Sequence, residues 1–260
     1  MRGSSYSKGG AFPVYLSQTN GKKVEIKYIL PALREKYDFS GYAEKDFVFT
    51  DIGAGEGTVT LPVIKFLKKK ARLEAYMIEP SSMMETLKAK CGGTRGANLH
   101  FIRESAENSG IPFSDFILLS HSASYIKEKK EFAKRLSDSL ARGGKILFVG
   151  TAKESEDLKL RKELNKESSG KNWKEKPREN IFEYLEKGGL KVKREKRDAW
   201  IDFSNAFRLN DAGKGLISFF LGKPFPELSK SEVENFLSAA KRLVKKNRLK
   251  KVLEFTWAER

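Results

Sequence analysis

The stretch Asp51–Pro62, "DIGAGEGTVTLP", decides the fold prediction. It places Gly53, Gly55 and Gly57 within five residues. A short β run, "DFVFTDIG" (46–53), leads into it, and "TVTLPVIKFLKKK" follows with apolar residues at helical spacing. Glycines adopt positive φ and let a ligand lie against bare backbone. A glycine-rich turn from strand to helix therefore predicts a nucleotide-like ligand at this edge of a parallel sheet.

Length and composition limit the classes of protein. A chain of 260 residues suits one α/β domain with an elaboration, or one large domain. No apolar run approaches ~18 residues, so a transmembrane helix is not expected. The start, "MRGSSYSKGGAFPVY", has no apolar segment typical of a signal peptide. Cys91 is the only cysteine, which predicts a cytoplasmic protein without disulfides or a metal centre.

The charge balance leaves two interpretations open. Lys and Arg total 51 and Asp and Glu 34, for a net charge of +17. A polyanion such as RNA is one partner that this charge would suit. A Lys/Glu-rich surface of the kind found in heat-adapted proteins is the other interpretation. Because acids are interleaved with the basic residues along the chain, a solvated charged surface is favoured over a nucleic-acid partner.

Strand and helix patterns alternate after the glycine loop. Further strands are expected at 73–79, 98–105, 114–122 and 145–152, with helices at about 126–141 and 154–167. "RENIFEYLEKGGLKVKREK" then repeats helix, double glycine and strand. This alternation predicts an α/β fold with a mostly parallel sheet and helices on both faces.

Four segments are expected. Residues 1–45 form an N-terminal tail and helical cap, whose helix (22–39) is interrupted or bent at Pro31. The core covers 46–205, a helical insertion covers 206–248, and 249–260 is the last strand. Capping boxes are expected at Ser82 with Glu85 and at Ser231 with Glu234.

The loop's carboxylates indicate which ligand it binds. The spacing Gly-x-Gly-x-Gly departs from the dinucleotide pattern, and Asp51 and Glu56 would repel a pyrophosphate. They suit S-adenosylmethionine, which has no phosphate and carries an ammonium and a sulfonium. Glu79 ends the second strand, 22 residues after Gly57. An acid at this position can accept hydrogen bonds from both ribose hydroxyls.

On these residues the chain resembles the class I S-adenosylmethionine-dependent methyltransferases. The resemblance covers roughly 46–200 and rests on "DIGAGEG", "IEPSSMM", "ESAENSGIPFSDFILLSHS" and "LARGGKILFVG" in this order. It implies a Rossmann-like seven-stranded sheet whose last strand is antiparallel, S-adenosylmethionine as cofactor and S-adenosylhomocysteine as product. The cofactor-binding residues that it implies are Asp51, Gly53, Ala54, Gly55, Glu56, Glu79, Pro80, Ser81, Met84, Glu104, Ser105, Ala106 and Ser120.

One departure from the family concerns the adenine. The family often has an acid before the Ala-Glu pair that follows the third strand, and this acid holds the adenine amine. Here Ser105 precedes Ala106 and Glu107. Glu104 or a backbone group is the expected substitute.

A narrower resemblance concerns the methyl acceptor. "VYLSQTN", "EPSSMM", "SHSASYIKEK" and the late insertion resemble histamine N-methyltransferase and its relatives. In that family a glutamate follows the Thr of the first segment and grips the substrate amine, whereas this chain has Asn20. The resemblance implies a small amine or a similar small nucleophile, with the insertion (206–248) over the site.

His121 is the candidate catalytic base. Methyl transfer needs alignment and exclusion of water, and an amine acceptor must also be neutral. His121 lies at the carboxyl end of the fourth expected strand, where this family's acceptor meets the methyl group. A histidine that only packs or binds backbone is an equally open interpretation, and His100, in mid-strand, is interpreted as structural.

Aromatic residues complete the expected acceptor pocket. Tyr15, Asn20, His121 and Tyr125 are candidates for substrate binding, with Trp173 and Trp200 as further walls. Such aromatics are more often core. The sequence therefore predicts methylation of a small-molecule nucleophile such as an amine. An RNA or protein methyltransferase and a non-catalytic S-adenosylmethionine-binding module remain as alternatives, and the oligomeric state is open.

Overall fold

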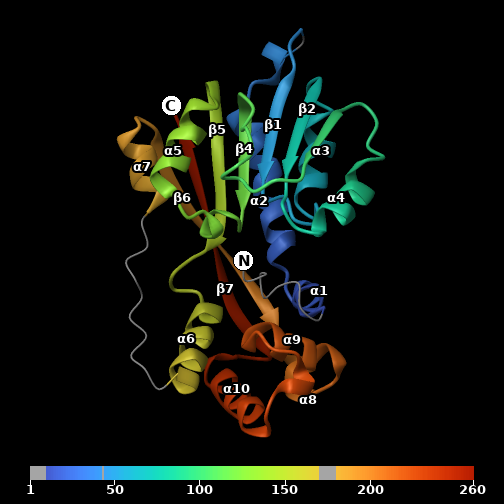
Figure 1. The fold of residues 1–260 in the computed structure, drawn as a ribbon, viewed down its shortest axis with the longest axis vertical. Helices are drawn as coiled ribbons and strands as arrows, with labels where there is room; N and C mark the ends of the chain where they lie inside the picture. The colour runs from blue at the N-terminus through green and yellow to red at the C-terminus, as the bar shows by residue number, and fades with distance from the viewer. Residues whose placement is uncertain (1–9, 43, 170–179) are drawn as a thin grey trace. The chain divides into compact units, whose positions relative to one another are not determined.

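The computed structural model describes residues 10–42, 44–169 and 180–260. Its described strands form one sheet in the order β3-β2-β1-β4-β5-β7-β6 (Figure 1). The pairs β1–β2, β1–β4, β2–β3 and β4–β5 are parallel, and the last strand is antiparallel. The predicted Rossmann-like fold is thereby confirmed. The strands are β1 Phe47–Ile52, β2 Leu73–Ile78, β3 Asn98–Ile102, β4 Ser114–Ser120, β5 Leu140–Thr151, β6 Lys191–Asp202 and β7 Arg248–Glu259.

The helices follow the predicted alternation. A helical insertion separates β6 from β7, as expected, and consists of α8, α9, η3 and α10. The α-helices are α1 Ala11–Ser17, α2 Gly21–Lys36, α3 Thr60–Leu67, α4 Met83–Cys91, α5 Lys129–Asp138, α6 Glu156–Ser169, α7 Ile181–Lys187, α8 Ser204–Arg208, α9 Asp211–Leu221 and α10 Lys230–Leu243. Short 3₁₀ turns are η1 Phe39–Tyr42, η2 Ala123–Tyr125 and η3 Phe225–Glu227.

The chain divides into two compact units. The larger unit contains Glu25–Gly150, Glu254–Arg260 and, between them in the sequence, the described residues 180–196. The smaller unit contains Arg197–Leu253 and the described residues 10–24 and 151–169. The core of the larger unit includes Ile52, Ile78, Ile117, Leu119 and Phe132, and that of the smaller unit includes Phe203, Leu216, Phe220 and Phe236.

The central strands are buried on both faces. In β1, five of six residues are buried, including Phe47, Phe49 and Asp51. A parallel strand covered by helices on each side reads as a near-continuous apolar run. The buried carboxylate of Asp51 at the end of such a run therefore needs a local partner, and the site supplies one.

The boundary between α5 and β5 was predicted wrongly. The double glycine of "ARGG" was expected to end a helix that reached residue 141, but α5 ends at Asp138 and β5 already begins at Leu140. The register between β4 and β5 shifts between Ser114 and Phe116. A Cβ on Gly144 would lie 2.9 Å from the Ser114 carbonyl oxygen. The glycine therefore serves a close approach of two strands, and this need is not visible in local sequence.

Helix ends also differ from expectation. Pro31 lies inside α2, which ends at Lys36 and not at residue 39. The Ser82 side chain makes no cap hydrogen bond. In α10 the capping box is formed by Ser229 and Glu232, two residues before the predicted pair. "SKSEVE" contains two overlapping S-x-x-E pairs, so spacing alone did not distinguish them.

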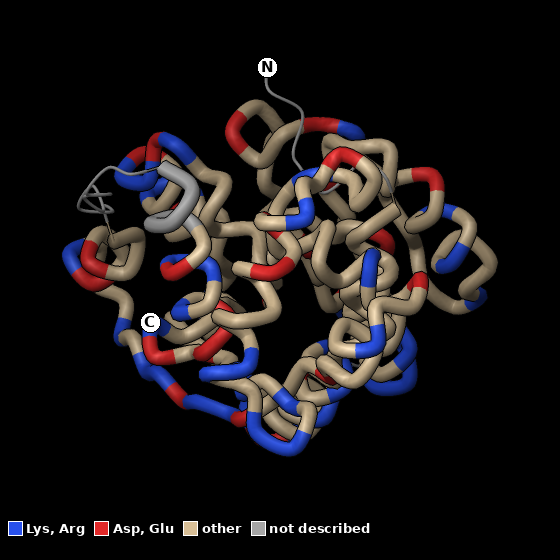
Figure 2. Tube along the Cα trace, turned by 90° about the horizontal axis from the view of Figure 1, so that it is seen from below, with Lys and Arg blue, Asp and Glu red and all other residues tan. Residues whose placement is uncertain are grey.

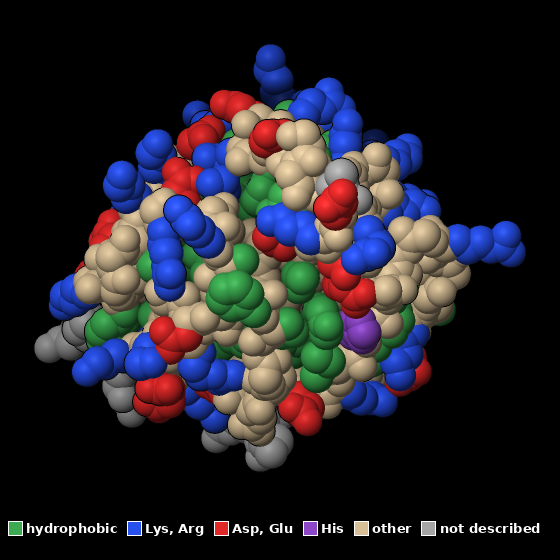
Figure 3. Space-filling model, turned by 90° about the horizontal axis from the view of Figure 1, so that it is seen from above, with side chains coloured by type: hydrophobic (Ala, Val, Ile, Leu, Met, Phe, Trp, Pro, Cys, Tyr) green, Lys and Arg blue, Asp and Glu red, His purple; other side chains and the backbone are tan. Residues whose placement is uncertain are grey.

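Basic and acidic residues are interleaved along the described chain. Figure 2 shows Lys and Arg along much of the chain, with Asp and Glu between them. On the face seen in Figure 3, hydrophobic side chains also lie among the basic and acidic ones, so the basic residues form no continuous stripe there. No helix among the described residues is long and apolar enough to cross a membrane.

Candidate functional site

The glycine loop between β1 and α3 has the conformation that its sequence predicts. Gly53, Gly55 and Gly57 have φ values of 76°, 57° and 81°. Side chains rarely adopt this left-handed region, whereas glycine adopts it readily. The Gly53 amide donates to the Ile78 carbonyl at 2.8 Å, and the Gly57 amide to the Ala54 carbonyl at 3.1 Å. The first bond holds the loop against the end of β2, and the second closes the loop on itself.

Space around the three glycines differs sharply. A Cβ on Gly53 would lie 2.4 Å from Ser122 Cβ, and one on Gly57 would lie 2.7 Å from Leu87 Cδ1. A Cβ on Gly55 would meet only Met83 Sδ, at 4.0 Å. Gly53 and Gly57 are therefore required by packing within the protein. Gly55 leaves bare backbone beside open space, which is the arrangement that a bound ligand needs.

Glu79 connects the loop after β1 to the loop after β2. Its Oε2 accepts from the Gly55 amide and its Oε1 from the Ser81 amide, both at 2.9 Å. The residue is buried. Because an ionised carboxylate offers about four acceptor positions, these two bonds leave capacity for further donors such as hydroxyls.

The other two acids of the loop have partners inside the larger unit. Asp51 is buried and accepts from Thr60 Oγ1 at 2.6 Å, which ties the end of β1 to the start of α3. Glu56 accepts from Thr58 Oγ1 at 2.8 Å, and its Oε2 lies 3.1 Å from Lys90 Nζ. These contacts shape the loop and balance part of its negative charge.

The remaining predicted cofactor residues lie in or next to the loops that follow β2, β3 and β4. Pro80 is exposed, and Met84 is fully buried in the core. Met83, which the sequence did not single out, is the methionine that borders Gly55. After β3, the Ser105 carbonyl accepts from the Ser109 amide at 2.9 Å, which forms a tight turn. In the same segment Glu104 is exposed and Ala106 is half-buried.

The end of β4 meets the glycine loop. Ser122 Oγ donates to the Ile52 carbonyl of β1. His121 has a φ of 59°, a left-handed conformation that is uncommon for any residue except glycine. Its amide donates to the Val149 carbonyl of β5 at 2.8 Å. The histidine is therefore held at the carboxyl edge of the sheet by its own amide, which bonds to β5, and by the side chain of the next residue, which bonds to β1.

Glu25 of α2 is a site residue that the sequence analysis missed. Its Oε2 accepts from Ser120 Oγ at 2.7 Å, and its Oε1 lies 3.0 Å from His121 Nε2. The Glu25 side chain is 1% exposed and that of His121 is 29% exposed. One signal could have revealed it: Glu25 shares the four-residue spacing of the buried Ile29 and Leu33 of α2 and of the buried Tyr37, which directly follows the helix.

Two predicted acceptor residues belong to the smaller unit. The Tyr15 ring stacks on Phe219 with centroids 3.9 Å apart, and its hydroxyl accepts from Lys251 Nζ at 2.8 Å. Asn20 Oδ1 accepts from the Trp200 amide at 2.8 Å. These contacts give both side chains a structural role within their unit. Tyr125, in η2 of the larger unit, is 57% exposed, and Trp173 lies outside the described residues.

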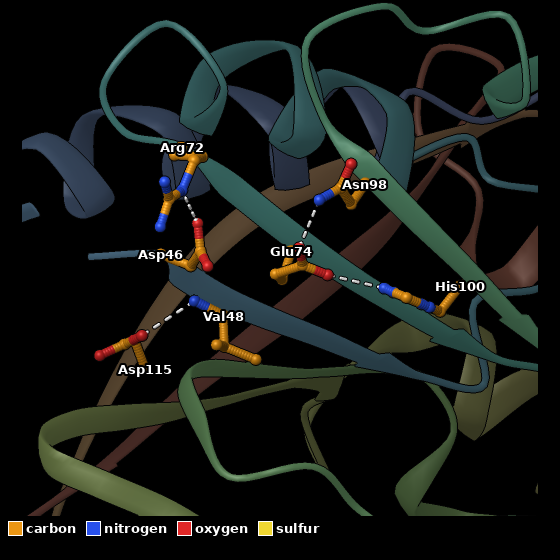
Figure 4. A network of polar contacts seen from close by, with 7 residues as sticks. All are labelled: Asp46, Val48, Arg72, Glu74, Asn98, His100 and Asp115. Atoms are coloured by element: carbon orange, nitrogen blue, oxygen red, sulfur yellow. Dashed lines mark hydrogen bonds and ion pairs between the residues drawn. The ribbon is translucent and has the colours of Figure 1, made fainter. Parts of the chain in front are cut away.

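The second histidine is part of a surface network on the outer strands. His100 Nε2 of β3 lies 2.7 Å from Glu74 Oε2 of β2, and Asn98 donates to the other oxygen of Glu74 (Figure 4). The His100 ring also stacks on Tyr76 at 4.2 Å. Figure 4 shows the contact of His100 with Glu74 at the same end of the sheet as two others. These are the contact between Arg72 and Asp46 and the hydrogen bond from the Val48 amide to Asp115. The interpretation of His100 as structural agrees with these contacts.

The described residues contain no candidate metal site. Over residues 10–42, 44–169 and 180–260, no group of three or more His, Cys, Asp or Glu side chains could hold a metal ion.

Comparison with known proteins gives similarity in structure but not in sequence. No family model and no curated protein matches the chain. A Bacillus halodurans protein named "putative methyltransferase" has 13% identity, a TM-score of 0.54, and a match that covers 89% of this chain and 98% of its own. The YcgJ protein of Bacillus subtilis has 16% identity, a TM-score of 0.52, and covers 85% and 96%.

A third solved structure agrees with these two. It is a Galdieria sulphuraria protein named "putative sarcosine dimethylglycine methyltransferase", with 12% identity, a TM-score of 0.50, and coverage of 90% and 84%. Together with the strand order, these similarities show that the chain has the class I S-adenosylmethionine-dependent methyltransferase fold. The narrower resemblance to histamine N-methyltransferase stays a prediction.

Proposed function

We propose that this chain transfers a methyl group from S-adenosylmethionine to a small-molecule nucleophile, with an amine as the preferred acceptor. The observation that carries the proposal is the open backbone at Gly55, hydrogen-bonded to the Glu79 carboxylate. Both lie at the carboxyl ends of neighbouring parallel strands, where open α/β sheets bind their ligands.

The residues of the loop fit S-adenosylmethionine in chemistry as well as in space. Gly53–Gly57 would offer backbone to the amino-acid portion, and Glu79 would accept hydrogen bonds from the ribose hydroxyls. Asp51 and Glu56 make this edge negative, which suits an ammonium and a sulfonium and disfavours a pyrophosphate. Bound there, S-adenosylmethionine supplies a methyl carbon that is already activated by its positively charged sulfur.

His121 is the proposed proton acceptor for the nucleophile. It lies at the end of β4 with part of its ring exposed and the Glu25 carboxylate behind it. A neutral imidazole can take a proton from the ammonium form of an amine or from a hydroxyl, and a positioned base of this kind contributes about 10²–10⁴-fold to a rate. The remaining contribution comes from alignment and from exclusion of water.

The preference for a small amine rests on charge. Glu25 places a buried negative charge next to His121, and the glycine loop adds further carboxylates. Such a surrounding attracts an amine and repels the phosphates of a nucleic acid. Basic and acidic residues are interleaved along the chain (Figure 2), and basic and acidic side chains are mixed on the face seen in Figure 3.

RNA or protein methylation is the second candidate, because the net charge of +17 favours association with polyanions. A non-catalytic module that binds S-adenosylmethionine is the third. One experiment separates all three. The protein is incubated with methyl-labelled S-adenosylmethionine and panels of small amines, RNA and proteins, while calorimetry measures cofactor binding. Label in amines supports the proposal, label in RNA or protein supports the second candidate, and binding without transfer supports the third.

A further inference from the structure

We propose that Glu25 is a positioning residue that fixes His121 as the tautomer able to accept the nucleophile's proton on Nδ1. The inference rests on the proposed function for its chemical meaning, but the arrangement itself is a property of the folded chain. It also narrows the acceptor to nucleophiles that carry an exchangeable proton.

The burial of Glu25 is the first observation. The side chain is 1% exposed and lies on the face of α2 that also carries the buried Ile29 and Leu33. Burial of a carboxylate is unfavourable unless hydrogen bonds compensate for lost water. Packing alone would be satisfied by another apolar residue at this position. The acid is therefore best explained by the groups that it contacts.

The contacts with Ser120 and His121 each use a different oxygen of the Glu25 carboxylate. Ser120 Oγ donates to Oε2 at 2.7 Å, and His121 Nε2 lies 3.0 Å from Oε1. The serine holds the carboxylate in a fixed orientation toward the histidine. Because the two residues are consecutive at the end of β4, a single side chain from α2 fixes both.

The chemistry of a carboxylate then determines the tautomer. An ionised carboxylate can only accept hydrogen bonds, so His121 Nε2 must carry the hydrogen. A neutral imidazole with a hydrogen on Nε2 keeps its lone pair on Nδ1. Nδ1 is therefore the nitrogen that can act as a base.

The backbone at His121 supports a functional role. Its φ of 59° lies in a region that is unfavourable for side chains. The hydrogen bond from the His121 amide to the Val149 carbonyl and the neighbouring hydrogen bond from Ser122 Oγ to the Ile52 carbonyl fix this conformation. Backbone strain held by surrounding contacts is concentrated at functional sites.

The resulting proton transfer is balanced. For an amine acceptor, an N–H bond of its ammonium form breaks, and for a hydroxyl acceptor, the O–H bond breaks. The bonding electron pair stays on the nitrogen or oxygen and becomes the pair that attacks the methyl carbon, while the proton binds His121 Nδ1. The imidazolium that forms is stabilised by the adjacent Glu25 carboxylate. Any amine that arrives in its ammonium form, and any hydroxyl, can take part in this step, whereas a thioether has no such proton to give.

The chain contains a matched control for this pair. Glu74 and His100 also contact through a carboxylate and Nε2, at 2.7 Å, but on the surface of β2 and β3 (Figure 4). These are the only two histidines in the sequence. NMR spectra will therefore contain signals of two imidazole rings, and the His100→Gln variant shows which signals belong to His100.

The first test measures the tautomers in the protein without ligand. Two-bond ¹H–¹⁵N NMR spectra of uniformly labelled protein are recorded at a pH where the imidazoles are neutral. We expect His121 to carry its hydrogen on Nε2, and Glu25→Gln to abolish that preference while His100 is unchanged. Glu74→Gln should alter His100 alone. A wild-type His121 with its hydrogen on Nδ1, or a His121 signal indifferent to Glu25→Gln, overturns the proposal whether or not a variant is stable.

The second test uses transfer of labelled methyl groups. Glu25→Gln should lower kcat toward the level of His121→Ala, about 10²–10⁴-fold below wild type, with S-adenosylmethionine affinity retained. Glu74→Gln should keep wild-type kcat. Equal kcat in Glu25→Gln and wild type contradicts the inference. Absence of S-adenosylmethionine binding in wild type instead contradicts the proposed function and leaves the tautomer result to decide the role of Glu25.

Discussion

Ser122 lies against the bare backbone of Gly53, so closely that a Cβ on that glycine would be 2.4 Å from Ser122 Cβ. The two residues follow β4 and β1 and are joined further by the bond from Ser122 Oγ to the Ile52 carbonyl. This contact connects the end of the strand that carries His121 to the glycine loop. Cofactor loop and candidate base are therefore parts of one packed arrangement within the larger unit.

Two glycines of the loop should respond differently to substitution. Gly53→Ala collides with Ser122 and should lower the thermal midpoint strongly. Gly55→Val meets open space, so it should cost only the left-handed strain, about 1–2 kcal/mol, yet it should abolish S-adenosylmethionine binding by filling the ligand's space. Thermal melts and calorimetry measure both effects.

Gly143→Val is the control for backbone strain. Gly143 has a φ of 76°, and a Cβ on this residue would meet nothing within 4 Å. This variant should lose similar stability and bind S-adenosylmethionine normally. Wild-type affinity in Gly55→Val would exclude the loop as the cofactor site.

Glu79 should contribute to both binding and stability. Glu79→Ala removes the acceptors for the Gly55 and Ser81 amides as well as those proposed for the ribose. Loss of hydrogen bonds to a charged group should weaken cofactor affinity by about 1–3 kcal/mol, measured by calorimetry. The control is Glu85→Ala, which removes an exposed acid of α4 that pairs with Arg103; it should change neither quantity. Comparable affinity in both variants would show that Glu79 merely shapes the loops.

The sequence predicted the elements whose cause is local. The strand and loop at 46–57 were found because a doubly covered strand is apolar and because left-handed turns need glycine. The start of β5 was missed because Gly144 serves an approach of two strands, not a helix end. Glu25 was missed because its partners lie 95 and 96 residues away. Pairings of this kind depend on tertiary structure. Helical spacing indicates that a residue is buried but not which residue it contacts.

Stability should fall at alkaline pH through Tyr37. Burial, and then the neighbouring Tyr42 and Asp115, raise the pKa of Tyr37 well above its usual value of 10.0. The folded state thus keeps a proton that the unfolded state releases, so this contribution is complete below pH 10 and is lost as pH rises above it. Urea unfolding of wild type and Tyr37→Phe should give curves that decline less steeply for the variant above pH 10.

Tyr37→Phe should also lose stability at neutral pH. The hydroxyl donates to the Asp115 carbonyl at 2.7 Å, and such a bond contributes about 0.5–1.5 kcal/mol. Tyr184→Phe, on α7, is the control for loss of a phenol outside this cluster. Parallel curves for wild type and Tyr37→Phe at high pH would refute the assignment.

Cys91 reports on the packing of the loop against α4. Burial, together with the charge of Asp51, raises the pKa of its thiol to about 11. The native thiol should therefore react very slowly with a disulfide reagent at pH 8 and rapidly in urea. A Cβ on Gly57 would lie 2.7 Å from Leu87 Cδ1 and 3.3 Å from Cys91 Sγ, so Gly57→Ala should speed the native reaction. Unchanged labelling would show that this contact is not required.

Salt dependence should decide between a small acceptor and RNA. A protein that neutralises six to ten phosphates loses about 10³–10⁵ in affinity between 50 and 200 mM salt, because bound counterions are released. The net charge of +17 predicts some RNA binding at low salt, but mixed acidic side chains and the carboxylates around His121 and Gly55 oppose a phosphate chain at the site. We expect RNA affinity that is weak, independent of sequence and lost at physiological salt, while methylation of a small amine continues. Filter binding and label transfer over the same salt series measure the two. Tight binding at 200 mM with label entering RNA would reverse the assignment and make the basic surface the recognition element.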